Sequence, residues 1–117
     1  MTSKEEVEAF LEQFKIKVSI WGIVFLDNRE KNAQTLLNLN ISRLERLDII
    51  NSIKIEDYSQ GPIIDALNDY GEMWVFGKDV KGVEIYIKIT IGKPNLKSIC
   101  ISFHQAEHPM KYPLKNK

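Results

Sequence analysis

The sequence has few residues of the kinds that form covalent cross-links or metal cages. It contains one cysteine, Cys100, and two histidines, His104 and His108. One thiol cannot form an internal disulfide, and structural zinc sites need several cysteine or histidine ligands. We therefore expect no metal ion and no cofactor, in a protein of the reducing cytoplasm that is stabilised by its hydrophobic core.

Long apolar runs are also missing. The most apolar stretch, residues 18–26, is about nine residues long, whereas a membrane-spanning helix needs about 20. The opening residues are acidic and lack the basic region and apolar core of a secretory signal. We expect a soluble, cytoplasmic protein with no membrane partner.

Charge of one sign does not dominate the chain as a whole, but the two signs are separated along it. Residues 1–77 hold 8 basic and 13 acidic side chains, a balance of −5, and residues 78–117 hold 8 and 3, a balance of +5. A positive surface formed by the later residues would be suited to binding phosphates. The alternative is that these lysines only solvate a surface and a tail.

The first half of the chain has the pattern of helices. Ser3 and Ser42 each precede a glutamate at the spacing of a capping box, which opens a helix. Apolar residues then recur at helical spacing, so we expect helices over residues 4–15 and 42–53. In the second of these we expect Leu44, Leu47, Ile50 and Ile53 to face inward. A further helix over residues 29–39, a short strand over 23–26 and a long loop over 54–71 complete this half.

The second half has the pattern of strands. Residues 72–78, 83–91 and 98–104 are rich in β-branched and aromatic side chains and are joined by short polar connections. Three such runs predict an antiparallel meander. The 117 residues suit one domain, residues 1–117. We therefore expect an α+β fold in which N-terminal helices pack on a mainly antiparallel sheet.

Alternation in two of these strands predicts which side chains share a face. Every second residue is apolar and should face the core: Val83, Ile85, Ile87, Ile89 and Ile91 in one strand, and Ile99, Ile101 and Phe103 in the other. Tyr86 and Lys88 should then lie on the opposite face, beside Cys100, Ser102 and His104.

The first strand of the meander has two possible registers. It adds either Trp74, Phe76 and Lys78 or Met73, Val75 and Gly77 to the Tyr86 face, depending on the hairpin at residues 79–82. We favour the first set, with a three-residue loop that puts Lys78 opposite Glu84. Aromatic rings, lysines and a histidine on one face suit RNA chemistry.

The stretch HQAEH, residues 104–108, has competing interpretations. It matches the H-x-x-E-H pattern of inverted zinc proteases, but it follows a strand and is ended by Pro109. Cys100 and His104 would lie about 13 Å apart in a strand, too far to share one ion. We favour His104 as a general acid or base, with Glu107 a possible orienting partner and His108 in the surface or tail. A structural or merely exposed histidine is the alternative.

Four ordered segments resemble a known family. They are RLERLDIINSIKIEDYSQGPIID (residues 43–65), MWVFGK (73–78), VEIYIKI (83–89) and CISFHQAEHPMKYPL (100–114). Over about residues 32–114 the chain resembles the motility quorum-sensing regulator (MqsR) toxins of bacterial type II toxin–antitoxin systems. The resemblance implies a RelE-like fold. Members of the family are endoribonucleases, or mRNA interferases, that arrest growth and are silenced by a bound antitoxin.

The resemblance also implies roles for particular residues. The family's catalytic tyrosine, in its V-Y-L-K-I strand, corresponds to Tyr86, and the neighbouring strand lysine corresponds to Lys88. The basic residue after S-F falls on His104, where the best-known branch has lysine. That branch's lysine after D-F-Y falls on Gln60, which can hydrogen-bond a phosphate but cannot neutralise it.

We therefore expect a metal-independent endoribonuclease toxin that cleaves mRNA and is neutralised by a cognate antitoxin. The expected catalytic residues are His104, Tyr86 and Lys88, and the expected RNA-binding residues are Lys78, Gln60, Trp74 and Ser102. Two alternatives stay open. One is a RelE-type enzyme that cuts mRNA only on the ribosome, and the other is a small RNA- or protein-binding module without catalysis.

Overall fold

The computed structural model describes residues 2–64 and 70–115. These residues form helices and strands in the order α1 (Lys4–Trp21), β1 (Ile23–Phe25), α2 (Glu30–Leu39), α3 (Arg43–Asn51), the short 3-10 helix η1 (Ile55–Asp57), β2 (Tyr58–Ile64), β3 (Glu72–Val80), β4 (Val83–Thr90) and β5 (Ser98–Gln105). Both predicted capping boxes are present, at Ser3 and at Ser42. No helix in the described part of the chain is long and apolar enough to cross a bilayer.

The strands form one mixed sheet in the order β1-β5-β4-β3-β2. β1 runs parallel to β5, and the other neighbours are antiparallel. The predicted meander is confirmed as β3-β4-β5, and the predicted α+β class is confirmed with it. The predicted loop over residues 54–71 is wrong in part, because it contains the edge strand β2. Gly61 and Pro62, which suggested a loop, lie within that strand at a register shift.

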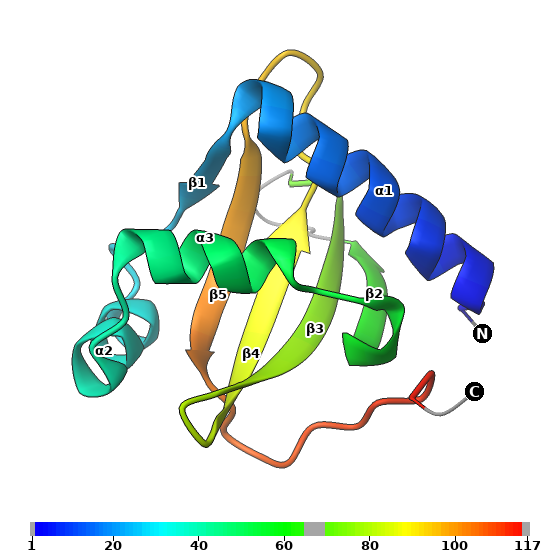
Figure 1. The fold of residues 1–117 in the computed structure, drawn as a ribbon. Helices are drawn as coiled ribbons and strands as arrows, with labels where there is room; N and C mark the ends of the chain where they lie inside the picture. Colours follow the sequence, from blue (N-terminus) through cyan, green and yellow to red (C-terminus); the bar gives the residue numbers. More distant parts are fainter. Residues whose placement is uncertain (1, 65–69, 116–117) are drawn as a thin grey trace.

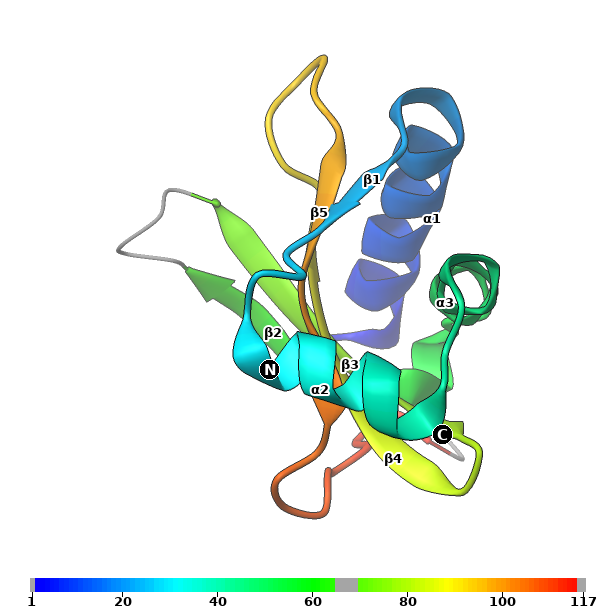
Figure 2. The ribbon, with the colours of Figure 1, turned by 90° about the vertical axis from the view of Figure 1, so that its left-hand side faces the viewer.

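Two helices cover one face of the sheet, which we call the inner face. Figures 1 and 2 show α1 and α3 on this side, with α2 beside the end of β5. The predicted apolar stripe of α1 is confirmed, since Val7, Phe10, Leu11 and Phe14 are all buried. Phe10 stacks on Trp74 with ring centroids 4.7 Å apart. Among the described residues, the opposite side, which we call the outer face, carries no helix other than the N-terminal end of α2.

The hairpin between β3 and β4 has a two-residue loop rather than the predicted three. Val80 pairs with Val83, and the loop residues Lys81 and Gly82 have φ of 55° and 83°. Two successive positive φ values are typical of the tight hairpin turn that matches strand twist. The favoured register is therefore wrong by one residue: Asp79, not Lys78, lies opposite Glu84.

This shift reverses the faces of β3. Gly77 lies opposite Tyr86 and Val75 opposite Lys88, so the second predicted set occupies the outer face. Trp74 and Phe76 pair with inward isoleucines of β4 and belong to the core.

A β-bulge in β5 changes the faces of two predicted residues, Ile99 and Cys100. Ser102 pairs with Lys88, but the next pair is Ile89 with Cys100, so Ile101 is the extra residue. Cys100 therefore belongs to the core, not to the outer face as predicted. Ile99 pairs with Thr90 on the outer side, so the prediction that it faces inward is wrong. Burial raises the pKa of its thiol to about 12. Asn32 of α2 holds the bulge, donating to the Ile101 carbonyl at 3.1 Å and accepting from the Phe103 N–H at 2.9 Å.

Helix α3 buries a charged residue where a leucine was expected. Leu44 is 74% exposed, so the prediction that it faces inward is wrong. Arg46 is buried instead, with two hydrogen bonds to Asp27 at 2.6 and 3.1 Å and its guanidinium 3.6 Å from the Phe25 ring centroid. The ion pair and the aromatic face together compensate part of the cost of burying the charge.

Candidate functional site

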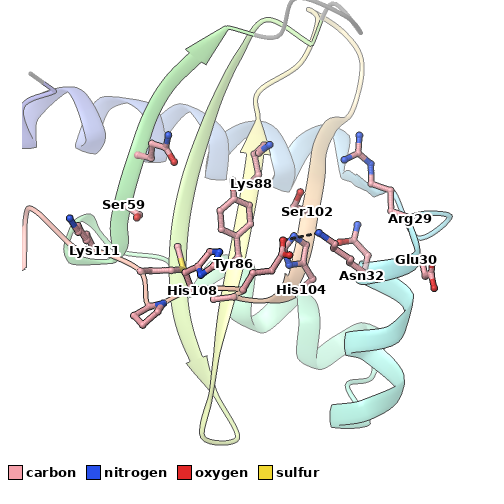
Figure 3. A pocket seen from close by; sticks show the side chains of 16 residues that line it. Arg29, Glu30, Asn32, Ser59, Tyr86, Lys88, Ser102, His104, His108 and Lys111 are labelled. Atoms are coloured by element: carbon pink, nitrogen blue, oxygen red, sulfur yellow. Dashed lines mark hydrogen bonds and ion pairs between the residues drawn. The ribbon is translucent and has the colours of Figure 1, made fainter.

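An open groove of about 990 Å³ lies on the outer face. It is bounded by β2, β4, β5, the start of α2 and the segment that follows β5 (Figure 3). Its lining residues are Arg29, Glu30, Lys31, Asn32, Ser59, Gln60, Tyr86, Lys88, Ser102, His104, Ala106, Glu107, His108, Pro109, Met110 and Lys111. The groove contains most of the chemically active side chains that the sequence suggested.

The centre of the groove is formed by four residues on two neighbouring strands. Tyr86 lies directly opposite His104, and Lys88 lies opposite Ser102. The predicted placement of these residues on one face is therefore confirmed. The Tyr86 and His104 rings stack with centroids 5.1 Å apart and planes 15° apart. The Lys88 ammonium lies 5.9 Å from the centre of the Tyr86 ring.

Backbone contacts orient the His104 imidazole. Its Nδ1 lies 2.9 Å from the carbonyl oxygen of Gln105. A carbonyl oxygen accepts but does not donate, so this contact requires the proton to be on Nδ1. The Nε2 atom then remains for proton transfer. A histidine held in this way presents Nε2 as a proton acceptor to a substrate in the groove.

Tyr86 and Ser102 form the floor of the groove. Partial burial raises the pKa of the Tyr86 phenol, so the hydroxyl remains protonated at neutral pH and can donate a hydrogen bond to a phosphate. Ser102 is only 5% exposed. It lies opposite Lys88 on the neighbouring strand and lines the groove.

The lining of the groove carries more positive than negative charge. Its four basic side chains are Arg29, Lys31, Lys88 and Lys111, and its two acidic ones are Glu30 and Glu107. Lys31 forms an ion pair with Glu107 at 2.7 Å. The hydrogen bond and charge of Lys31, followed by the charges of His104 and His108, lower the pKa of the Glu107 carboxyl. The side chain that bonds Glu107 is thus Lys31. The prediction that Glu107 orients His104 is not supported, because His104 acts on Glu107 only through its charge.

The segment after β5 is fastened across the sheet by Glu84. The backbone N–H of Ala106 donates to the Glu84 carbonyl at 2.9 Å. The N–H of Met110 and the hydroxyl of Tyr112 donate to the Glu84 carboxylate at 3.0 and 2.6 Å. Gly77 makes room for this arrangement, because a Cβ there would overlap the Tyr112 hydroxyl and lie 2.8 Å from two ring carbons. We call residues 106–112 the strap.

The strap was missed by reading the sequence. It brings His108 into the groove, although we expected this histidine in the surface or tail. The signals in the sequence were Gly77, in the middle of the buried strand β3, and Glu84, on the polar side of the neighbouring strand β4. Neither signal identifies its partner in the sequence.

Two expected RNA-binding residues lie away from the groove. Trp74 is 5% exposed and packs against Phe10 in the core. Lys78 extends from the inner side of β3, where its ammonium pairs with Asp57 at 3.0 Å. The predicted placement of both on the Tyr86 face is wrong, because the hairpin register differs by one residue. Gln60 does line the groove, next to Ser59 on β2.

The metal interpretations of residues 100–108 find no geometric support in the described part of the chain. No group of three or more His, Cys, Asp or Glu side chains there is arranged to hold an ion. Cys100 lies on the inner face and His104 on the outer face, so these two side chains do not converge.

Comparison with known proteins gives no match to a protein-family model, to a curated protein or to a solved structure. The groove and the residues that line it are therefore the structural basis for inferring a function.

Proposed function

We propose that the protein is a metal-independent endoribonuclease whose active site is the groove on the outer face. The observation that carries this proposal is the meeting of His104, Tyr86 and Lys88 at the floor of an open groove with a positive lining. A proton-transfer group, a hydrogen-bond donor and a fixed positive charge are what RNA cleavage by transesterification requires.

The chemistry uses the 2′-hydroxyl of the RNA as the nucleophile. His104 Nε2 removes the 2′-hydroxyl proton while the 2′-oxygen bonds to phosphorus. Lys88 stabilises the additional negative charge on the phosphoryl oxygens, and the neutral Tyr86 hydroxyl donates a hydrogen bond to one of them. The bond from phosphorus to the 5′-oxygen then breaks, and this oxygen takes up a proton. The products are a 2′,3′-cyclic phosphate and a 5′-hydroxyl.

The shape of the groove favours single-stranded RNA. The stacked pair of Tyr86 and His104 is only half-buried, so an unpaired base has an aromatic surface to contact. Stacking of this kind contributes about 1–3 kcal/mol per base and tolerates different sequences. Arg29 and Lys111 in the lining are placed to contact the neighbouring phosphates.

The biological setting follows from the family resemblance. We propose that the protein is the toxin of a type II toxin–antitoxin system in the cytoplasm, where it cleaves mRNA until a cognate antitoxin neutralises it. Support comes from the ordered motifs that contain Tyr86, Lys88 and His104. In agreement with this setting, induction of the chain alone should arrest growth, and the antitoxin should relieve the arrest.

The direct test is incubation of purified, antitoxin-free protein with naked single-stranded RNA, with and without EDTA. We expect cleavage in both conditions and products with cyclic phosphate ends. Cleavage that EDTA abolishes would contradict the metal-independent mechanism. Cleavage that occurs only on ribosomes would favour the RelE-type alternative. Binding of RNA without any cleavage would favour the non-catalytic module.

A further inference from the structure

We propose that His108 is the general acid of the cleavage reaction, with His104 as the general base. This inference rests on the proposed function and adds the group that protonates the departing 5′-oxygen. His108 is exposed and lines the same groove as Tyr86 and Lys88. Figure 3 shows the His104 and His108 side chains on either side of Tyr86.

The strap holds His108 over the groove at both ends. Two residues before it, the Ala106 N–H is bonded to the backbone of Glu84, and two residues after it, the Met110 N–H is bonded to the Glu84 carboxylate. The Tyr112 hydroxyl binds the second carboxylate oxygen. A short segment fixed at both ends restricts where its central residue can lie. His108 therefore projects from a fastened segment and not from a loose tail.

Displacement at phosphorus needs two proton-transfer groups on opposite sides of the scissile bond. The attacking 2′-oxygen and the departing 5′-oxygen lie roughly in line through phosphorus, so one residue cannot serve both in the same step. In this proposal the phosphate lies over Tyr86, within reach of Lys88, with His104 to one side and His108 to the other. One imidazole then accepts the proton of the nucleophile, and the other protonates the leaving group.

The two histidines differ in a way that assigns their roles. The Gln105 carbonyl holds the His104 proton on Nδ1, which leaves the Nε2 lone pair to act as the base. His108 is exposed to solvent and can regain a proton from water after each turnover.

The charges around His108 come from several elements. On the strap itself lie Glu107 and Lys111. From the other elements, His108 shares the groove with Glu30, Lys31 and Arg29 of the α2 region, Tyr86 and Lys88 of β4, and His104 of β5. The pKa of the Glu107 carboxyl is lowered chiefly by Lys31, with smaller contributions from the charges of His104 and His108.

The step balances with these two groups alone. The 2′-oxygen loses its proton to His104 and forms a bond to phosphorus. The bond from phosphorus to the 5′-oxygen breaks, and its electron pair takes the proton of His108. His104 ends protonated and His108 ends neutral. Exchange with water restores both, so the reaction needs no further reactant.

The test compares His108→Ala and His104→Ala on two substrates. One is an ordinary oligonucleotide, and the other carries sulfur in place of the bridging 5′-oxygen, a leaving group that does not need protonation. On the ordinary substrate each variant should lose about 100- to 10,000-fold in rate. On the sulfur substrate His108→Ala should recover to within about tenfold of the unmodified protein, whereas His104→Ala should stay slow. Lys78→Ala, on the inner face, is the control for both.

A second readout is the pH dependence of the rate. The unmodified protein should show a bell-shaped profile, and His108→Ala should lose the fall at high pH, because that fall reports deprotonation of the acid. A His108→Ala variant with the full rate, or one that is equally slow on both substrates, would overturn the assignment of the acid. Recovery of His104→Ala in place of His108→Ala would reverse the two roles and overturn it too. If the unmodified protein cleaves neither substrate, the proposed function itself fails.

Discussion

The inner and outer faces of the sheet use alternate residues of the same strands, yet they differ in burial and chemistry. In β4, Ile85, Ile87 and Ile89 have no exposed surface against the helices. Between them, Tyr86 and Lys88 are only half-buried and line the groove. Apolar burial on one side provides most of the stability of the fold. The other side is therefore free to hold polar groups whose loss changes chemistry more than folding.

Two lysines show the same contrast at the level of single residues. Lys78 and Lys88 lie on adjacent strands of one sheet, but Lys78 pairs with Asp57 on the inner side whereas Lys88 lies in the groove beside Tyr86. Identical side chains thus have different surroundings because a strand alternates its faces. Substitutions on the two faces should separate stability from activity.

The largest effect on activity is expected at His104. His104→Ala should reduce the rate of RNA cleavage by about 100- to 10,000-fold, because it removes the base. The ring is partly exposed at the end of β5, so the thermal unfolding midpoint should change little. Single-turnover cleavage measured beside a thermal melt checks both. A variant that cleaves at the full rate would contradict the site.

The largest effect on stability is expected at Trp74. Trp74→Ala empties space against Phe10 in the core, and such changes cost about 3–5 kcal/mol in the free energy of unfolding. Chemical denaturation measures this cost. At a temperature where the variant is folded, its cleavage rate should equal that of the unmodified protein, since Trp74 does not reach the groove. A selective loss of cleavage by a stable variant would show that the faces are coupled.

The two lysines form a matched pair. Lys88→Ala should lower the cleavage rate by about 100- to 1,000-fold, the usual cost of removing one transition-state donor. Lys78→Ala should leave the rate unchanged and cost about 1–3 kcal/mol of stability, because its ion pair with Asp57 is largely buried. Equal rates for the two variants would contradict the division between faces.

A smaller effect is expected where the strap is fastened. Tyr112→Phe removes a hydrogen bond to a carboxylate, worth about 1–2 kcal/mol at a partly exposed site. Amide exchange over residues 106–112 should therefore become faster, whereas exchange in the core of β4 should not. Gly77→Ala should act in the same direction by displacing the Tyr112 ring. Unchanged exchange in both variants would show that Glu84 does not hold the strap.

The smallest effect concerns Cys100 and pH. Burial raises the pKa of this thiol to about 12, so almost none of it is the reactive thiolate near neutral pH. The thiolate is the form that attacks thiol reagents. Native protein should therefore resist alkylation at neutral pH, and denatured protein should react quickly. Rapid alkylation of native protein would place Cys100 on the outer face after all.

Much of this arrangement follows from periodicity. Strict alternation of isoleucines in β4 is enough to place Tyr86 and Lys88 together, and the apolar spacing of α1 identifies the helix face that meets the sheet. These patterns are reliable because many apolar side chains must share one core.

The predicted faces are wrong where a single extra or missing residue reverses which side chains of a strand point to the core. The bulge at Ile101 turns Cys100 inward, and the tight turn at Lys81 turns Trp74 and Lys78 away from the groove. Single-residue shifts depend on partners such as Asn32, which lies far away in the sequence. The same is true of the strap, because Met110 and Tyr112 are 26 and 28 residues from their partner Glu84 in the sequence.

In the proposed function, the outer face binds and cleaves RNA, whereas the inner face only supports the outer one. The most direct test is an NMR titration of the protein with an RNA whose 2′-hydroxyls are methylated, so that it binds without being cleaved. We predict amide shifts centred on Tyr86, Lys88, His104 and His108, with Trp74 and Lys78 unchanged. Shifts centred on α1 and α3, or no shifts on the outer face, would contradict the claim.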